Sequence, residues 1–119
     1  MRTTLMTLAL CFGFALAACD DNGGDRSECS DAARADTVLD LVPDETAGAM
    51  VFSQTCGVSS CHGADGNIGA APDLSNRVPD HDSEELACLL LAGQGTMPSQ
   101  SSLSDQQLAD VLAYVEATF

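Results

Sequence analysis

The sequence predicts a small all-α domain with long loops. Three stretches carry helix-capping signals and apolar residues at helical spacing. No stretch alternates between apolar and polar residues convincingly enough to be a strand. The chain has 119 residues, which leaves room for one folded domain beside whatever its termini devote to targeting. We expect the folded domain to span residues 43–119.

Local signals place the three predicted helices in order along this domain. The first covers residues 43–55, because Pro43 and the acidic residues after it are typical of a first helical turn. The second covers residues 82–92, and Gly93 ends it. The third runs from residue 104 to the C-terminus, begins with a capping-box pattern and repeats apolar residues at helical intervals.

Two other segments are expected to be less regular. Residues 63–80 are punctuated by glycines and prolines and are predicted to be a loop between the first two helices. Residues 31–41 could form a short helix.

The N-terminus resembles the export signal of a bacterial lipoprotein. Residues 1–18 combine a basic start with an apolar run too short to span a bilayer. The tetrad Leu-Ala-Ala-Cys that ends at Cys19 resembles a lipobox, which implies cleavage before this cysteine and lipid on its thiol. The alternative is an ordinary signal peptide, cut at the small residues. We expect an exported protein, anchored by lipid to a bacterial membrane, with its folded domain in the periplasm.

The composition indicates an acidic protein on a flexible tether. Residues 19–42 are rich in Asp, Gly, Ser and Ala and are predicted to link the lipid to the domain. Four basic residues, none of them Lys, stand against 18 acidic ones, so the formal net charge is −14. Such a surface is repelled by phosphate backbones, which argues against nucleic-acid binding and favours a partner with a cationic docking face. The alternative is that the acids only keep the protein soluble.

The predicted domain has few large apolar side chains with which to form a core. Its aromatic residues are Phe52, Tyr114 and Phe119 alone. A domain of this size with long loops buries little apolar surface and usually needs a metal, disulfides or a bulky cofactor.

The cysteines indicate what completes the core. Cys29, Cys56, Cys61 and Cys88 lie beyond the signal and the lipid site, and thiols of exported proteins are usually bonded to something. Cys56 and Cys61 are followed at once by His62, so two thiols and an imidazole share one turn. Two thiols can add to the vinyl groups of haem, although the usual spacing has two residues between the cysteines rather than four. A disulfide that closes a short loop, or part of a zinc site, would also fit this spacing.

Around this motif the chain resembles small bacterial class I monohaem cytochromes c over nearly the whole predicted domain. The resemblance rests on the Cys-x4-Cys-His motif, on Pro72-Asp73-Leu74, and on the Gly-rich segment 93–98 that contains Met97. It implies the small cytochrome c-like fold of three main helices around one covalently attached haem c. It also implies that His62 and Met97 ligate the iron, and that the carbonyl of Pro72 accepts a hydrogen bond from the other ring nitrogen of His62.

The same resemblance implies how the first and last helices pack. Gly48 and Phe52 match the glycine and aromatic residue of the family's first helix, and Val111 and Tyr114 match its C-terminal helix where the two cross. His81 is expected to be a solvated loop residue, with a role as replacement for Met97 as the less favoured alternative.

The four-residue gap departs from the family and leaves the cysteine bonding open. In the favoured arrangement Cys56 and Cys61 both bond to haem and Cys29 and Cys88 are left over, and the sequence leaves open whether these two form a disulfide between tether and second helix. In the alternative only Cys61 bonds to haem, and Cys56 pairs with Cys88.

Two axial ligands leave no open position on the iron, so the resemblance implies an electron carrier with redox partner proteins rather than an enzyme. A small haem peroxidase is the less favoured catalytic alternative. The competing class is a non-haem lipoprotein, a binding module stapled by disulfides or by zinc held through Cys56, Cys61, Cys88 and a histidine.

Overall fold

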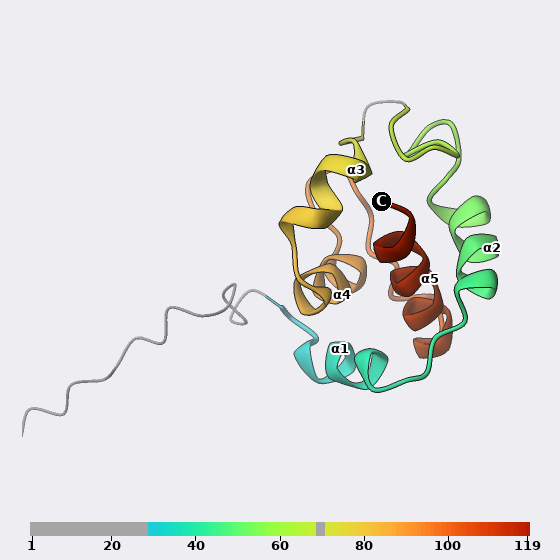
Figure 1. The fold of residues 1–119 in the computed structure, drawn as a ribbon. Coiled ribbons are helices and arrows are strands. Elements are labelled where there is room, and N and C mark those ends of the chain that lie inside the picture. The colour runs from blue at the N-terminus through green and yellow to red at the C-terminus, as the bar shows by residue number, and fades with distance from the viewer. Residues whose placement is uncertain (1–28, 69–70) are drawn as a thin grey trace, which may run out of the picture.

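A computed structural model gives the fold, and it describes residues 29–68 and 71–119. Within these ranges the chain forms five α-helices, one 3₁₀ turn and no strand, so the predicted all-α class is confirmed (Figure 1). The elements are α1 (Ala32–Leu39), α2 (Glu45–Thr55), α3 (Leu74–Arg77), η2 (Val78–Asp80), α4 (Ser83–Ala92) and α5 (Asp105–Thr118). The predicted signal, Cys19 and the first part of the tether lie outside the described residues. None of the described helices has the length and apolar character needed to cross a membrane.

Side-chain caps fix the starts of the three long helices. The carboxylate of Asp44 accepts hydrogen bonds from the backbone N–H groups of Thr46 and Ala47, at 2.8 and 3.1 Å. Reciprocal capping boxes begin α4, at Asp82, and α5, at Ser104. These caps satisfy N–H groups that have no partner inside a helix, which is why short sequence signals predicted the starts correctly.

The most extensive helix packing is between α2 and α5, and it depends on Gly48. A Cβ atom at this position would meet the carbonyl carbon of Asp110 at 2.5 Å and Cβ of Tyr114 at 2.9 Å. The crossing of first and last helices expected from the family is therefore confirmed. Next to it, the ring of Phe52 packs 5.4 Å from that of Tyr114 and 5.5 Å from that of Phe119, measured between centroids.

Replacing Gly48 with alanine is expected to lower the free energy of unfolding by about 1 to 3 kcal/mol, because the helices must separate to admit a methyl group. Denaturant unfolding of the mature protein measures this change. The matched control is Met50→Ala in the same helix, where the side chain is 59% exposed and a change within about 0.5 kcal/mol is expected. Equal free energies of unfolding for Gly48→Ala and Met50→Ala would show that α2 and α5 leave room for a methyl group at their crossing.

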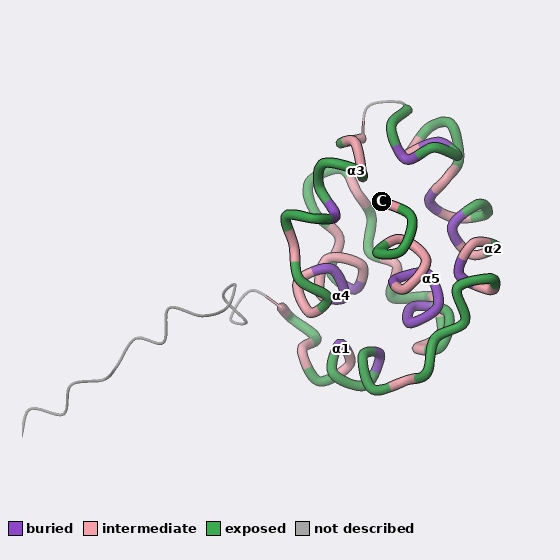
Figure 2. Tube along the Cα trace, in the orientation of Figure 1, coloured by how far each residue is buried: buried purple, intermediate pink, exposed green. Residues whose placement is uncertain are grey.

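Helix α1 belongs to the packed domain, although it lies within the stretch 19–42 that the sequence assigned to the tether. Ala35 and Val38 are buried in the main core cluster together with residues of α4 and α5. Arg34 donates from Nε to Oδ1 of Asp105 at 2.7 Å, and its other nitrogens donate to the carbonyls of Ser101 and Leu103. Figure 2 shows buried residues on the inner sides of α1, α2, α4 and α5. The packed structure therefore starts before residue 43.

A disulfide also ties the beginning of the described chain to α4. Cys29 and Cys88 are bonded, and Cys56 and Cys61 are free thiols. The structure thus answers the question that the sequence left open for Cys29 and Cys88, and the alternative pairing of Cys56 with Cys88 is wrong. A cross-link between residues 59 positions apart contributes about 4 kcal/mol by the chain-entropy argument.

The stretch 63–80 is more regular than its glycines and prolines suggested. It contains α3 and η2, where we expected only loop. Asp73 caps α3 by accepting a hydrogen bond from the N–H of Ser75 at 2.9 Å. Elements of four and three residues are too short for periodicity to reveal them, and the proline within η2 reads as a loop signal although it suits a first helical position.

Candidate functional site

The two free cysteines and His62 lie on one closed turn that follows α2. The N–H of His62 donates to the carbonyl of Cys56 at 3.1 Å, which joins the two ends of the turn. Inside it, the carbonyl of Val58 accepts hydrogen bonds from Cys61 and Gly63, each at 3.0 Å. The four residues between the cysteines are therefore taken up in a bulge with its own hydrogen bonds, and both cysteines line the same cavity.

The two thiols differ in burial. Cys56 is 8% exposed and Cys61 is half-buried. Burial, and then the neighbouring Cys61 thiol, raise the pKa of Cys56 to about 11. Cys56 is accordingly a protonated thiol at neutral pH as long as nothing is bonded to it.

Hydrogen bonds of its backbone fix the position of His62. The N–H of His62 donates to the carbonyl of Cys56, and the carbonyl of His62 accepts a hydrogen bond from the N–H of Ile68 at 2.9 Å. Its Nδ1 is buried and has no hydrogen-bond partner among the described residues. The expected hydrogen bond to the carbonyl of Pro72 is therefore not formed in this structure, although Pro72 lines the same cavity as His62. Burying a polar nitrogen without a hydrogen-bond partner costs free energy. Nδ1 of His62 is therefore able to form one more hydrogen bond than the described residues provide.

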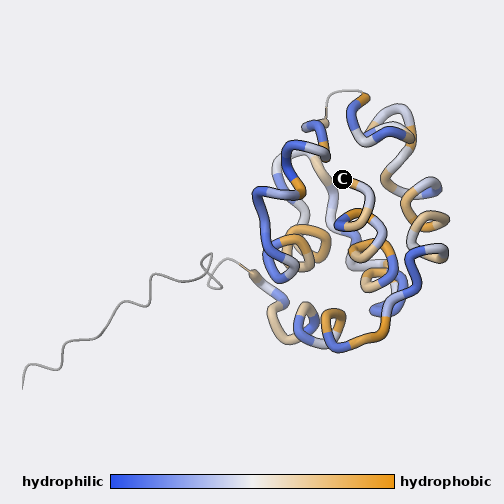
Figure 3. Tube along the Cα trace, viewed as in Figure 1, coloured by the Kyte–Doolittle hydropathy of each residue, from blue (hydrophilic) through white to orange (hydrophobic). Residues whose placement is uncertain are grey.

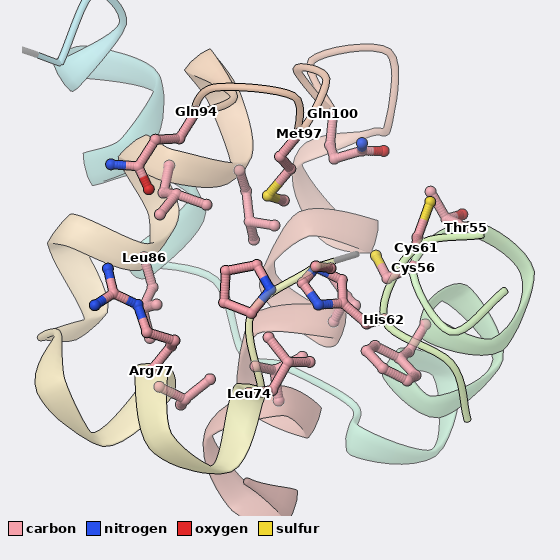
Figure 4. Close-up of a pocket in the computed structure, with 18 of the residues that line it drawn as sticks. Thr55, Cys56, Cys61, His62, Leu74, Arg77, Leu86, Gln94, Met97 and Gln100 are labelled. Atoms are coloured by element: carbon pink, nitrogen blue, oxygen red, sulfur yellow. The ribbon is translucent and has the colours of Figure 1, made fainter. Parts of the chain in front are cut away.

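Met97 lies in a tight loop between α4 and α5. Gly93 ends α4 at φ +74°, and a Cβ atom there would approach the carbonyl oxygen of Met97 at 2.5 Å. Gln94 and Met97 exchange two backbone hydrogen bonds of 2.9 and 3.1 Å, and Gln100 donates to the carbonyl of Leu90 at 2.7 Å. These contacts hold the half-buried thioether of Met97 at the wall of a cavity (Figure 4).

This cavity, of about 470 Å³, brings the predicted site residues together. Its volume lies within the range of about 300 to 1,000 Å³ that is usual for cofactor and ligand sites. Cys56, Cys61, His62, Pro72 and Met97 all line it, from three separate segments of the chain (Figure 4). Figure 3 shows that α4 is apolar beyond its acidic first turn. The apolar lining comes mainly from α2, α3, η2, α4 and α5: Phe52, Leu74, Val78, Leu86, Leu89, Leu90, Val111, Leu112 and Val115.

The lining fits the cofactor that the sequence predicts. The porphyrin ring of haem is large and apolar, so it needs a mainly apolar cavity. Covalent attachment also needs two thiols, and the iron needs an imidazole nearby. The cavity supplies these groups, together with the soft thioether of Met97.

Sequence reasoning assigned no role to two polar residues on the cavity wall, Arg77 and Gln94, and considered His81 there only as a less favoured alternative to Met97. His81, expected to be solvated, is half-buried with Nδ1 3.2 Å from Oε2 of Glu85, and its Nε2 is buried without a described partner. The one sequence signal for these wall residues was that Arg77 and His81 are four residues apart, a helical spacing. We did not use it, because the stretch 63–80 was predicted to be a loop.

The zinc alternative is wrong in the form considered. Cys88 is bonded to Cys29 and so cannot join Cys56 and Cys61 as a ligand. Across residues 29–68 and 71–119 no group of three or more His, Cys, Asp or Glu side chains is arranged to hold a metal ion.

Comparison with known proteins identifies one family. The family model of cytochrome c oxidase, cbb3-type, subunit III matches residues 43–115. No curated protein matches the chain. No solved structure matches it either.

Proposed function

Because the chain belongs to the family of subunit III of cbb3-type cytochrome c oxidase, we propose that it transfers electrons through one haem held by Cys56, Cys61, His62 and Met97. Membership implies a c-type cytochrome with covalently bound haem c and its iron, which serve electron transfer. The observation that carries the residue assignment is the single cavity that gathers two free thiols, an imidazole and a thioether.

Each of these residues has a separate task. Cys56 and Cys61 would hold the cofactor to the turn after α2 through thioethers. His62 and Met97 would both ligate its iron, which would leave no ligand site for oxygen or peroxide. When bound, haem supplies an iron that accepts and releases one electron. The thioether of Met97 favours the reduced state more than a second imidazole would.

The protein around these ligands limits the access of water. The side chains of Leu86, Leu90, Val111 and Leu112 line the cavity from α4 and α5. An apolar environment disfavours the extra positive charge of the oxidised form, so this lining also supports a high reduction potential.

Spectroelectrochemical titration tests this proposal. A single wave with one-electron slope is expected, and carbon monoxide should leave the spectrum of the reduced protein unchanged. Rapid carbon monoxide binding would reveal an open coordination site and would favour the peroxidase alternative instead.

We propose further that lipid on Cys19 anchors the chain to a membrane after export. The support is the lipobox-like tetrad and the basic, apolar stretch before it. Changing Cys19→Ser is expected to move the protein from the membrane fraction to the soluble periplasmic fraction, whereas the neighbouring change Asp20→Ser should leave it in the membrane. Wild-type protein in the soluble fraction would contradict the anchor.

The partners proposed for this carrier are redox proteins with a cationic docking face. The net charge of −14 supports this, because opposite charges speed the encounter of two proteins and like charges slow it. Oxidation by a small cationic metal complex should slow as ionic strength rises, and oxidation by an anionic one should accelerate. The same salt dependence for both complexes would argue that the acids only confer solubility.

A further inference from the structure

Arg77 is an unpaired cation in a strongly acidic chain. The described residues include two arginines, Arg34 and Arg77. Arg34 is fully engaged, with an ion pair to Asp105 and two backbone carbonyl partners. The guanidinium of Arg77 forms no hydrogen bond or ion pair with any residue of the described ranges, despite 18 acidic residues in the sequence. Yet Arg77 lines the cavity.

The position of Arg77 is opposite the cysteines. Figure 4 shows Cys56 and Cys61 on one side of the cavity, and Arg77 with Gln94 on the other. His81, which follows on the same stretch of chain, also lines the cavity and has a buried Nε2 without a described partner. One side of the cavity therefore carries sulfur, and the other side carries hydrogen-bond donors and a positive charge.

This polarity matches the chemistry of haem. Its two vinyl groups lie on one half of the macrocycle, and its two propionates lie on the other. If the vinyl carbons are bonded to Cys56 and Cys61, the propionates extend toward the side where Arg77 lies. Two further carboxylates in a protein of net charge −14 need a cationic or hydrogen-bonding partner. Arginine suits this best, since its planar fork can donate two parallel hydrogen bonds to one carboxylate.

We propose that Arg77 binds a haem propionate, and that Nε2 of His81 lies within the same polar end of the site. This inference rests on the proposed function. A positive charge close to the haem favours the reduced form, whose iron carries one positive charge less. Arg77 is thus a positioning and potential-setting residue rather than an iron ligand.

The test compares Arg77→Gln, Arg77→Lys and Arg34→Gln in the mature protein. Arg77→Gln is expected to lower the equilibrium constant for reduction roughly threefold or more, about 28 mV at 59 mV per tenfold change. Arg77→Lys keeps the charge and should recover most of that shift. Arg34→Gln removes the same charge away from the cavity and should shift the potential much less.

A second measurement reports on the propionate itself. In reduced-minus-oxidised infrared spectra of protein with isotope-labelled haem propionates, the carboxylate band should move in Arg77→Gln and stay in place in Arg34→Gln. Mass spectrometry first establishes that each variant carries covalent haem. A haem-bearing Arg77→Gln protein with the wild-type potential and infrared band would overturn the propionate contact and leave the electron-transfer function intact. Wild-type protein without covalent haem would overturn both.

Discussion

Replacing both Cys56 and Cys61 with alanine is expected to abolish covalent attachment of haem. Both cysteines are free thiols and both line the cavity, whereas the remaining described cysteines are bonded to each other. Either single change should leave haem held by one thioether. After export in a host with cytochrome maturation machinery, intact mass before and after acid-acetone extraction measures the attachment. The pyridine haemochrome spectrum reports the number of unsaturated vinyl groups.

The matched control removes the other two cysteines. Cys29→Ser with Cys88→Ser should keep full haem attachment and lose stability, up to about 4 kcal/mol by the chain-entropy argument. If Cys56→Ala has the haemochrome spectrum of the wild type, only Cys61 is attached and double attachment is wrong. In that case the bulge between the two cysteines would hold Cys56 away from the cofactor.

Replacing Met97 is expected to cause the largest change in reduction potential. Met97→His should lower the potential by on the order of a few tenths of a volt, since axial-ligand identity spreads haem potentials over about 0.8 V. Met97→Ala should remove the sulfur-to-iron charge-transfer band and allow carbon monoxide to bind the reduced protein. Spectroelectrochemistry and absorption spectra measure both effects.

Met50→Ala is the control for Met97, because it removes an exposed thioether from outside the cavity. Its potential and spectrum should equal those of the wild type. An unchanged charge-transfer band in Met97→Ala would contradict methionine ligation by this residue. If the wild type lacked the charge-transfer band and Met97→Ala had the wild-type potential, His81 would be the candidate ligand in place of Met97. It is the other imidazole on the cavity wall.

The sequence predicted the long helices because the relevant signals are local. Asp44, Asp82 and Ser104 cap backbone groups within the next few residues, so the pattern can be read without knowing the fold. Helix α1 was harder to predict, because its eight residues are stabilised by distant partners. Val38 is buried against α4 and α5, and Arg34 reaches residues near the start of α5. Such tertiary contacts leave little trace in the segment itself.

The same distinction applies to the site. The adjacency of Cys61 and His62 and the Gly-rich surroundings of Met97 are visible in the sequence, and the resemblance to class I cytochromes c linked them before any geometry was known. The roles of Arg77 and His81 depend on what lies across a cavity, which spacing along the chain does not reveal. The absent hydrogen bond between His62 and Pro72 shows the converse, since a contact expected from the family is not formed here.

The central claim is that a haem is covalently held in the cavity between α2, α4 and α5. Acid-acetone extraction of the mature wild-type protein, followed by a pyridine haemochrome spectrum and an intact mass, tests it most directly. We predict a red polypeptide whose colour survives extraction and whose mass exceeds that of the processed chain by one haem. A colourless protein with the mass of the processed polypeptide alone would contradict the claim.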